Sequence, residues 1–381
     1  MHGWIWELFR NVLDVNQYGA IRGTCTTHAL ITMLHHWLNG TDNASERNFI
    51  QIVLLDYAKA FDHVDPNILL HKLTCMNIPD ALLRWIENFL SNRQQRVKIG
   101  GTMSDWTEIW GTVPQGTLLG VLFFIIMIND LSTNCNTIKY VDDTTLFHVS
   151  NDPQDMSLQN AVNVAINWSD QNNMKINASK TKEMLVHYMK SPPDVPAINV
   201  KGQNVHRVSE CKLLGVYFNE KLNWNTHADK IYRKASQRVH FINCLRRTRM
   251  SSKELVKIYV SLVRPVVEYA CQLWHAGLTM YQRDLIESIQ ERVLKIIYPS
   301  LDYEHSLEEA KLETLEKRRD RLCEKLFVEA QHPCHRLNPL LPPLKDDSYR
   351  STRDYYPFVI PLTHTNRFRD TFINYSLNNK W

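Results

Sequence analysis

The stretch that decides the fold is Thr137-Ile138-Lys139-Tyr140-Val141-Asp142-Asp143-Thr144-Thr145-Leu146-Phe147-His148-Val149. Apolar and β-branched residues flank an adjacent pair of aspartates, and neither Gly nor Pro interrupts them. The pattern predicts two strands joined by a two-residue turn at Asp142-Asp143. An ordinary structural hairpin fits the same pattern, because Asp is a common turn former.

A second aspartate follows another predicted strand. The continuous apolar run from Ile50 to Leu55 predicts a central strand that is covered on both faces, and it ends at Asp56. A carboxylate at the end of a buried strand is unfavourable unless a positive charge compensates it. Asp56 is therefore either the N-cap of a helix or a ligand for a cation.

Composition indicates a globular protein. The chain has 381 residues, of which 44% are hydrophobic and 22% charged, and its net charge is only +4. Its eight cysteines form no C-x-x-C pair, which is typical of a reduced intracellular protein and disfavours a zinc finger. The apolar run from Leu118 to Ile128 is too short to span a membrane, so it predicts a buried core helix and no membrane partner.

Further motifs lie between and after these elements. Gln115 and Gly116 lie in a loop before the buried helix, where a glycine allows the backbone to approach a ligand closely. Asn177–Thr181 leads into another strand, and Leu214-Gly215 interrupts a later strand or hairpin.

In this order, the motifs resemble those of the reverse transcriptases of non-LTR (LINE-type) retrotransposons of the jockey-like kind. Leu55–Asp62 resembles the first catalytic motif, Val113–Gly116 the template and nucleotide loop, Tyr140–Asp143 the catalytic hairpin, Asn177–Thr181 the lysine motif and Leu214-Gly215 the primer grip. The later stretches Val263–Ala270 and Asn366–Phe368 are similar to elements of the same family. The match covers nearly the whole chain, and the set of motifs is far more specific than any single tetrapeptide.

The resemblance implies an α+β fold of the right-hand polymerase type, with an antiparallel-sheet palm, partial fingers, a helical thumb and a helical C-terminal region. We expect partial fingers at residues 1–48 and a palm at 49–190, into which a fingers and helical segment at 66–110 is inserted. Primer grip and thumb are expected at 197–262, and the helical C-terminal region at 263–381.

The implied activity is RNA-directed DNA synthesis, in which two metal ions assist nucleotidyl transfer to a primer 3′-hydroxyl. Such transfer needs carboxylates from separate elements that hold ions about 3.5–4 Å apart. Asp56 and Asp142 are the expected ligands, and Asp143 is a weaker one. Mg²⁺ suits these hard oxygen donors, and Mn²⁺ can replace it. Lys180 is the candidate for neutralising the pyrophosphate leaving group, with Lys182 and a solvated surface lysine as alternatives.

The substrates implied are dNTPs, an RNA template and a DNA primer. Phe61 stands where the family carries a bulky steric gate against a 2′-hydroxyl, although aromatic residues more often pack in a core. Gln115 and Gly116 are the expected nucleotide-side contacts. Leu214 and Gly215 are the expected primer-side contacts.

A basic helix follows the predicted palm. No acidic residue occurs from Lys230 to Arg249, and Lys230, Arg233, Lys234 and Arg238 are expected on one helical face. Apolar residues fall on another face, so the helix would dock on the core and present cations to a phosphate backbone, as a polymerase thumb does. A purely solubilising face is the alternative.

Departures from the family pattern favour a second hypothesis. Val121 stands where the family usually has Pro, Cys25 where it has Ser, and no basic fingers strands precede Met1. We therefore expect an element truncated at its 5′ end, whose polymerase activity is impaired by the missing fingers, and the alternative function is an inactive retroelement remnant that only binds RNA. An RNA-dependent RNA polymerase is disfavoured by Phe61. The expected location is intracellular, with the nucleus implied by the resemblance only.

Overall fold

The computed structural model describes residues 2–109, 113–114, 116–345 and 357–381. The chain forms two compact units. Unit 1 consists of Met1–Cys25, Ile50–Leu185 and Ser191–Val208, and unit 2 consists of Thr26–Phe49, Val186–Lys190 and Ser209–Trp381. Among the described residues, no helix combines the length and the apolar character that crossing a membrane requires.

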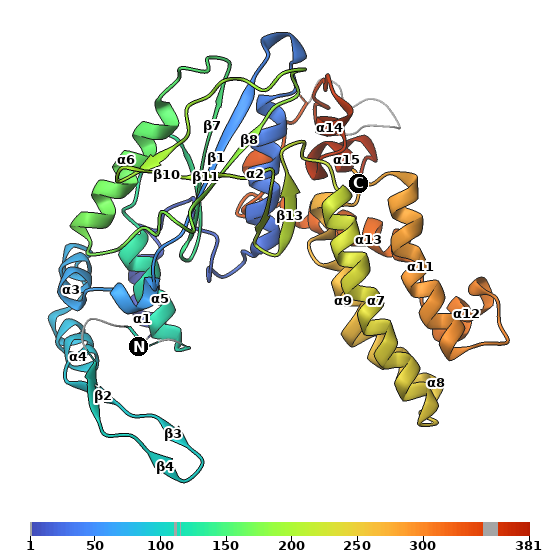
Figure 1. The fold of residues 1–381 in the computed structure, drawn as a ribbon, viewed down its shortest axis with the longest axis horizontal. Coiled ribbons are helices and arrows are strands. Elements are labelled where there is room, and N and C mark those ends of the chain that lie inside the picture. The colour runs from blue at the N-terminus through green and yellow to red at the C-terminus, as the bar shows by residue number, and fades with distance from the viewer. Residues whose placement is uncertain (1, 110–112, 115, 346–356) are drawn as a thin grey trace. The chain divides into compact units, whose positions relative to one another are not determined.

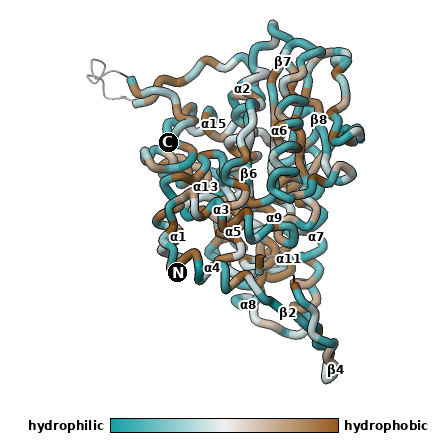
Figure 2. Tube along the Cα trace, turned by 90° about the vertical axis from the view of Figure 1, so that its left-hand side faces the viewer, coloured by the Kyte–Doolittle hydropathy of each residue, from teal (hydrophilic) through white to brown (hydrophobic). Residues whose placement is uncertain are grey.

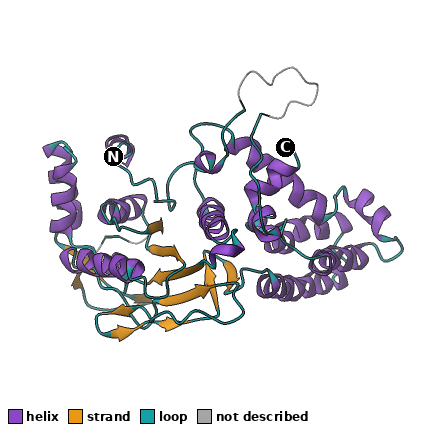
Figure 3. Cartoon of the chain, turned by 90° about the horizontal axis from the view of Figure 1, so that it is seen from above, coloured by secondary structure: helices purple, strands orange, loops and turns teal. Residues whose placement is uncertain are grey.

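Unit 1 is built on a five-stranded sheet with the order β11-β8-β1-β7-β6, whose strands are orange in Figure 3. β6 pairs with β7 in antiparallel fashion, whereas β11 joins β8 in parallel. The strands are β1 (Phe49–Leu55), β6 (Asn136–Tyr140), β7 (Asp143–Ser150), β8 (Lys182–Val186) and β11 (His206–Arg207). The predicted central strand at residues 50–55 is confirmed, and all but one residue of β1 are buried.

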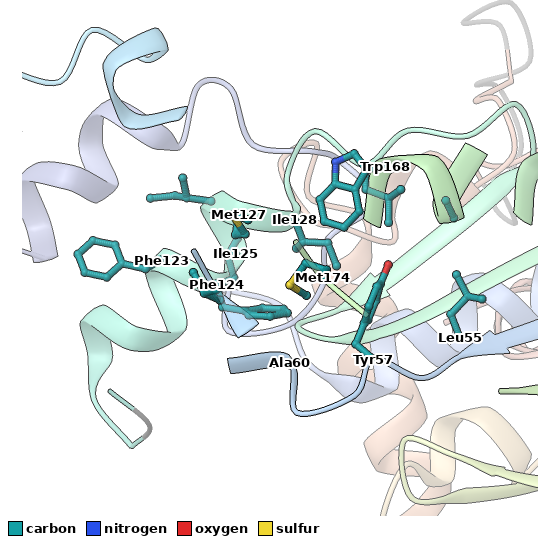
Figure 4. Close-up of a cluster of buried hydrophobic side chains, with 14 of the residues drawn as sticks. Leu55, Tyr57, Ala60, Phe123, Phe124, Ile125, Met127, Ile128, Trp168 and Met174 are labelled. Atoms are coloured by element: carbon teal, nitrogen blue, oxygen red, sulfur yellow. The ribbon is translucent and has the colours of Figure 1, made fainter. Parts of the chain in front are cut away.

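Five helices and a 3₁₀ turn surround this sheet. They are α1 (His2–Phe9), η2 (Ala60–His63), α3 (Pro66–Cys75), α4 (Asp80–Leu90), α5 (Leu118–Ile128) and α6 (Ser157–Gln171). From Leu122 to Ile128 every residue of α5 is buried, which confirms the predicted core helix, and the tube is brown there in Figure 2. Figure 4 shows part of the cluster into which α5 packs, including Phe124, Trp168 and Met174.

Three short strand pairs complete unit 1. β2 (Arg93–Gln95) pairs with β5 (Thr107–Ile109), and β3 (Lys98–Ile99) pairs with β4 (Thr102–Met103) across Gly100-Gly101. Figure 1 shows these four strands as one long arm of the ribbon. The third pair is β9 (Asn199–Val200) with β10 (Gln203–Asn204).

The predicted turn of the β6–β7 hairpin is wrong by one residue. Tyr140 pairs with Asp143, so the two-residue turn is Val141-Asp142 and Asp143 is the first residue of β7. The same register runs along the hairpin, where Ile138 pairs with Thr145 and Thr137 pairs with Leu146. A shift by one residue would move every side chain of the strand to the opposite face of the sheet.

Unit 2 consists mainly of helices around one hairpin. The hairpin joins β12 (Glu210–Leu213) to β13 (Val216–Asn219). The helical elements are α2 (Thr26–Gly40), η1 (Ala44–Glu46), α7 (Asn225–Arg247), α8 (Ser252–Ile258), η3 (Tyr259–Val263), α9 (Arg264–Glu268), α10 (Cys271–Trp274), α11 (Met280–Ile297), α12 (Tyr303–Ala310), α13 (Leu315–Ala330), η4 (Asn338–Leu340), α14 (Asn366–Arg369) and α15 (Phe372–Asn378). The α+β class is therefore confirmed, while the division into fingers, palm and thumb stays a prediction.

Candidate functional site

Asp56 lies directly after β1, at the edge of the unit 1 core. Its neighbours Leu55 and Tyr57 are buried in that core, and Figure 4 shows both side chains there, while Asp56 itself is half-buried. The N-cap hypothesis for Asp56 is wrong, because Lys59 is the N-cap of η2 and Asp65 is the N-cap of α3. Packing on both sides thus places the carboxylate without giving it a capping role.

The main chain of Asp56 is held by the segment that precedes β8. Its N–H donates to the Thr181 hydroxyl oxygen at 3.3 Å, and its carbonyl oxygen accepts from the Asn177 N–H at 2.7 Å. Lys180 lies in the same loop, and its side chain is exposed. The predicted lysine motif is therefore bonded directly to the residue that carries the first carboxylate.

The β6–β7 hairpin brings two more carboxylates to this end of the sheet. Asp142 is half-buried in the turn, and Asp143 begins β7, which lies next to β1. Burial raises the pKa of Asp142, and the charge of Asp56 raises it further. The pKa of Asp143 is raised in the same direction, first by loss of water around its carboxyl and then by the charges of Asp142 and Asp56. The three carboxylates are thus close enough to repel one another.

Within the described part of the chain, no ion pair compensates Asp56, Asp142 or Asp143. These oxygens are hard donors, which is the kind that Mg²⁺ prefers. The described residues contain no set of three His, Cys, Asp or Glu side chains already arranged to hold a metal ion.

Phe61 lies in η2, one turn after Asp56. Its ring stacks on Phe124 of α5, with the ring centroids 4.7 Å apart and the planes inclined by 26°. Phe124 is fully buried, whereas Phe61 is only half-buried. One face of Phe61 is therefore used for core packing, and the part that remains accessible is compatible with a steric gate.

The loop before α5 is described only in part, and Gln115 lies outside the described residues. Gly116 has a positive φ of 78°, and an added Cβ would meet no atom within 4 Å, so the residue is needed for its backbone conformation and not for space. Gly120 is different, because a Cβ there would lie 2.0 Å from the Pro114 carbonyl oxygen. The close approach of Pro114 to the start of α5 therefore requires glycine.

In unit 2, the predicted primer-grip residues form the turn of the β12–β13 hairpin. Leu214 and Gly215 both have positive φ, of 44° and 88°. The Tyr269 hydroxyl donates to the Leu214 carbonyl oxygen at 2.8 Å, and a Cβ on Gly215 would lie 2.9 Å from the Tyr269 ring. Tyr269 thus supports this turn directly.

A cavity of about 420 Å³ lies between this hairpin and helix α7. The residues that line it include four cations and two tyrosines: Lys212, Tyr217, Lys230, Lys234, Arg238 and Tyr269. Lys212 and Lys230 both lie over the Tyr217 ring, at 5.7 and 5.8 Å from its centroid. Such a concentration of positive charge beside aromatic rings is typical of a surface that binds nucleic acid.

The four basic residues that were predicted to present charge on α7 differ in their partners. Lys230 and Lys234 are exposed and line the cavity, one helical turn apart. Arg238 also lines it, but its guanidinium donates to the Leu262 carbonyl oxygen. Arg233 instead pairs with Asp229 on the preceding turn, at 3.0 Å. The cavity therefore takes its free charge mainly from the two lysines of α7 and from Lys212.

Three of these residues were missed by the sequence argument. Lys212 stands two residues before the predicted primer grip. It alternates with buried residues in β12, and this alternation could have marked it as an exposed cation beside the grip. Tyr217 lies in the paired strand, and Tyr269 lies in a stretch that was noted for its resemblance without a role. The sequence around Tyr269 does not indicate its contact with Leu214, because the two residues are 55 positions apart in the chain.

Comparison with known proteins identifies similar chains. The family model described as "Reverse transcriptase (RNA-dependent DNA polymerase)" matches residues 3–218, more than half of the chain. A shorter model, described as the N-terminal part of alkylated DNA repair protein alkB homolog 8, matches residues 224–263. The predicted resemblance to jockey-like reverse transcriptases is confirmed by the curated relatives.

One of these relatives is "Probable RNA-directed DNA polymerase from transposon BS" of Drosophila melanogaster, 24% identical over 303 residues, with 76% of this chain and 33% of the relative covered. Another is "RNA-directed DNA polymerase from mobile element jockey" of Drosophila funebris, 27% identical, with 65% and 28% covered. The chain thus spans about a third of the length of these relatives. Among solved structures, apo telomerase from Candida tropicalis is 11% identical with a TM-score of 0.43, and the match covers 89% of this chain and 54% of that one.

Proposed function

Because the chain belongs to the reverse transcriptase (RNA-dependent DNA polymerase) family, we propose that it catalyses RNA-directed DNA synthesis. In this reaction a deoxynucleotide is transferred from a dNTP to the 3′-hydroxyl of a DNA primer on an RNA template. The observation that carries the proposal is the convergence of Asp56 and Asp142 at one end of the unit 1 sheet, where their charges interact without a compensating cation.

Asp56 and Asp142 would hold two Mg²⁺ ions, with Mn²⁺ as a substitute, and Asp143 would contribute more weakly. When bound, the ions lower the energy of charge that develops on the attacking and leaving oxygens. The contribution of the chain is to keep Asp56 and Asp142 side by side before substrate binds. Their mutual repulsion is relieved only when positive charge arrives.

Lys180 would neutralise the pyrophosphate leaving group, because its loop is bonded to the main chain of Asp56. Phe61 would exclude a 2′-hydroxyl with the accessible part of its ring. Gln115 and Gly116 would contact the incoming nucleotide, and Leu214 and Gly215 would contact the primer. These roles are carried over from the family motifs, and the positions described above support them for every one of these residues except Gln115.

The nucleic acid partner would be bound in unit 2 by Lys230 and Lys234. Both ammonium groups line the cavity beside α7, and Arg238 adds charge while it is tied to Leu262. Contacts of this kind to phosphate bind all sequences alike. They would hold the template–primer duplex without selecting it.

Primer extension on an RNA template with Mg²⁺ tests the proposal, with dNTPs and rNTPs supplied in parallel. We expect extension with dNTPs, and a loss of at least about 1,000-fold in Asp56→Asn and in Asp142→Asn, equivalent to about 4 kcal/mol of barrier. Asp143→Asn should lose less. Asp105→Asn, which changes an exposed aspartate between β4 and β5, is the matched control and should extend normally.

The other outcomes separate the alternatives. RNA binding without any extension would indicate the inactive remnant. Extension with rNTPs in preference to dNTPs would indicate an RNA polymerase. Full activity in both strong variants would disprove the assignment of Asp56 and Asp142 as metal ligands.

A further inference from the structure

The turn that carries Asp142 has an unfavourable backbone conformation. Val141 has a φ of 59°, and Asp142, the second residue of the turn, does not have a positive φ. A two-residue hairpin turn with positive φ at its first position only is of the II′ kind, in which glycine is strongly preferred. A β-branched residue at such a position costs on the order of 1–3 kcal/mol, so contacts elsewhere must hold the turn.

The contacts come from a segment near the N-terminus. The Gln17 side-chain oxygen accepts a hydrogen bond from the Val141 N–H at 3.0 Å and another from the Gly19 N–H at 2.8 Å. Gln17 is almost fully buried, with 1% of its surface exposed. Gly19 lies against the same turn, because a Cβ there would be 2.4 Å from the Val141 nitrogen.

This segment is itself fixed to strand β6. The Tyr18 N–H donates to the Lys139 carbonyl oxygen, and the Lys139 N–H donates to the Asn16 carbonyl oxygen, both at 2.8 Å. The fully buried Lys139 ammonium pairs with Asp14 at 2.6 Å. It also donates to the Ile128 and Leu131 carbonyl oxygens at the end of α5. Gln17 therefore lies in a segment that hydrogen bonds and an ion pair hold against β6 and the end of α5.

We propose that Gln17 is a positioning residue that holds the Val141-Asp142 turn in its strained conformation and thereby places the Asp142 carboxylate for catalysis. Its role in catalysis rests on the proposed polymerase function. Gln17 does not touch the reacting atoms. It acts through the Val141 N–H, and Gly19 acts with it by allowing the segment to approach the turn.

The test variant is Gln17→Met, which keeps the length and much of the volume of the side chain but removes the acceptor oxygen. Asn129→Ala is the matched control, because Asn129 binds the same segment at Val12 and Asp14 and does not touch the turn. Hydrogen–deuterium exchange of a peptide that contains residues 140–143 measures the Val141 hydrogen bond without reference to activity. Thermal unfolding confirms that each variant is folded.

We expect faster exchange at the turn in Gln17→Met and a kcat lower by about 10- to 100-fold, since misplacement of a reacting group by about 1 Å has that effect. The KM for template–primer should be unchanged. Asn129→Ala should keep the exchange rate of the turn and the kcat of the wild type. If Gln17→Met does not fold, Gln17→Leu replaces it, because it also removes the acceptor oxygen from the Val141 N–H.

Unchanged exchange at residues 140–143 in the substituted protein would overturn the proposal. So would faster exchange with an unchanged kcat, because the turn would then be irrelevant to the reaction. A wild-type chain without extension activity would instead contradict the proposed function, and the exchange measurement would still show whether Gln17 holds the turn.

Discussion

The N–H of Asn177 donates a hydrogen bond to the carbonyl oxygen of Asp56 over 2.7 Å. Thr181 closes the same arrangement, since its hydroxyl oxygen accepts from the Asp56 N–H and donates to the Asn177 carbonyl oxygen. The loop that carries Lys180 is therefore attached to Asp56, the first of the proposed metal ligands. These bonds hold the main chain of the Lys180 loop close to Asp56, and the exposed side chain of Lys180 extends from it.

Lys180→Gln should lower the rate of primer extension by about 10- to 100-fold, as expected when a positioned proton donor or cation is removed. Binding of template–primer should change little. Lys182→Gln is the control, because Lys182 is equally exposed but lies in β8, beyond the loop. Single-turnover rates at saturating dNTP measure the effect. The reverse result, with Lys182→Gln impaired and Lys180→Gln normal, would transfer the role to Lys182.

Lys230→Gln combined with Lys234→Gln should weaken binding of template–primer duplexes of all sequences alike. The slope of log K against log salt should fall by about two units, one for each lost phosphate contact. Arg233→Gln should alter the slope much less, because Arg233 is already paired with Asp229 on the same helix. Fluorescence anisotropy at several salt concentrations measures the slope. An equal slope in the double variant and the wild type would assign these lysines to solubility.

Phe61→Val should raise the incorporation of rNTPs relative to dNTPs, because less of the side chain then opposes a 2′-hydroxyl. It should also cost about 1–3 kcal/mol of unfolding free energy through the lost stacking on Phe124. Phe124→Leu is the control, since it removes the same stacking from the buried side and leaves Phe61 in place. Sugar selection that is equal in both variants would show that Phe61 acts only in the core.

Asp142→Asn should make the metal-free protein more stable at pH 7. Burial, and then the charge of Asp56, raise the pKa of Asp142, so the folded state holds its proton more strongly than the unfolded state. The unfolding free energy therefore falls as the pH rises from the unfolded pKa, about 3.9, through the folded pKa, and the loss is complete above it.

The gain in Asp142→Asn should accordingly shrink as the pH is lowered from 7 to 4, which thermal unfolding in the presence of a chelator measures. Mg²⁺ should stabilise the wild type more than the variant, because only the wild type keeps the full set of ligands. If Asp142→Asn is less stable than the wild type at pH 7 without metal, the charge of Asp142 is not unfavourable in the folded state and the prediction is wrong.

Local sequence determined the elements that carry the site. The apolar run before Asp56 predicted a buried strand, which β1 is, and Asp65-Pro66 is a typical sequence for a helix start, where Asp65 is the N-cap of α3. The apolar stretch from Leu118 predicted a buried core helix, and α5 is buried from Leu122 to Ile128. Such features depend on propensity and periodicity over a few residues, which the sequence contains completely.

The tertiary structure alone decided the register of the turn that carries Asp142 and which of the basic residues of α7 line the cavity. The Asp-Asp pair gave no means of choosing between a turn at residues 142-143 and one at 141-142, because that choice depends on how β6 pairs with β7 and on the contacts of Val141 with a distant segment. Spacing placed Arg233 with Lys230 and Lys234, yet an ion pair to Asp229 withdraws it from the cavity. Gln17 and Val141 are 124 residues apart, and only packing of the whole chain brings a buried acceptor to a strained turn.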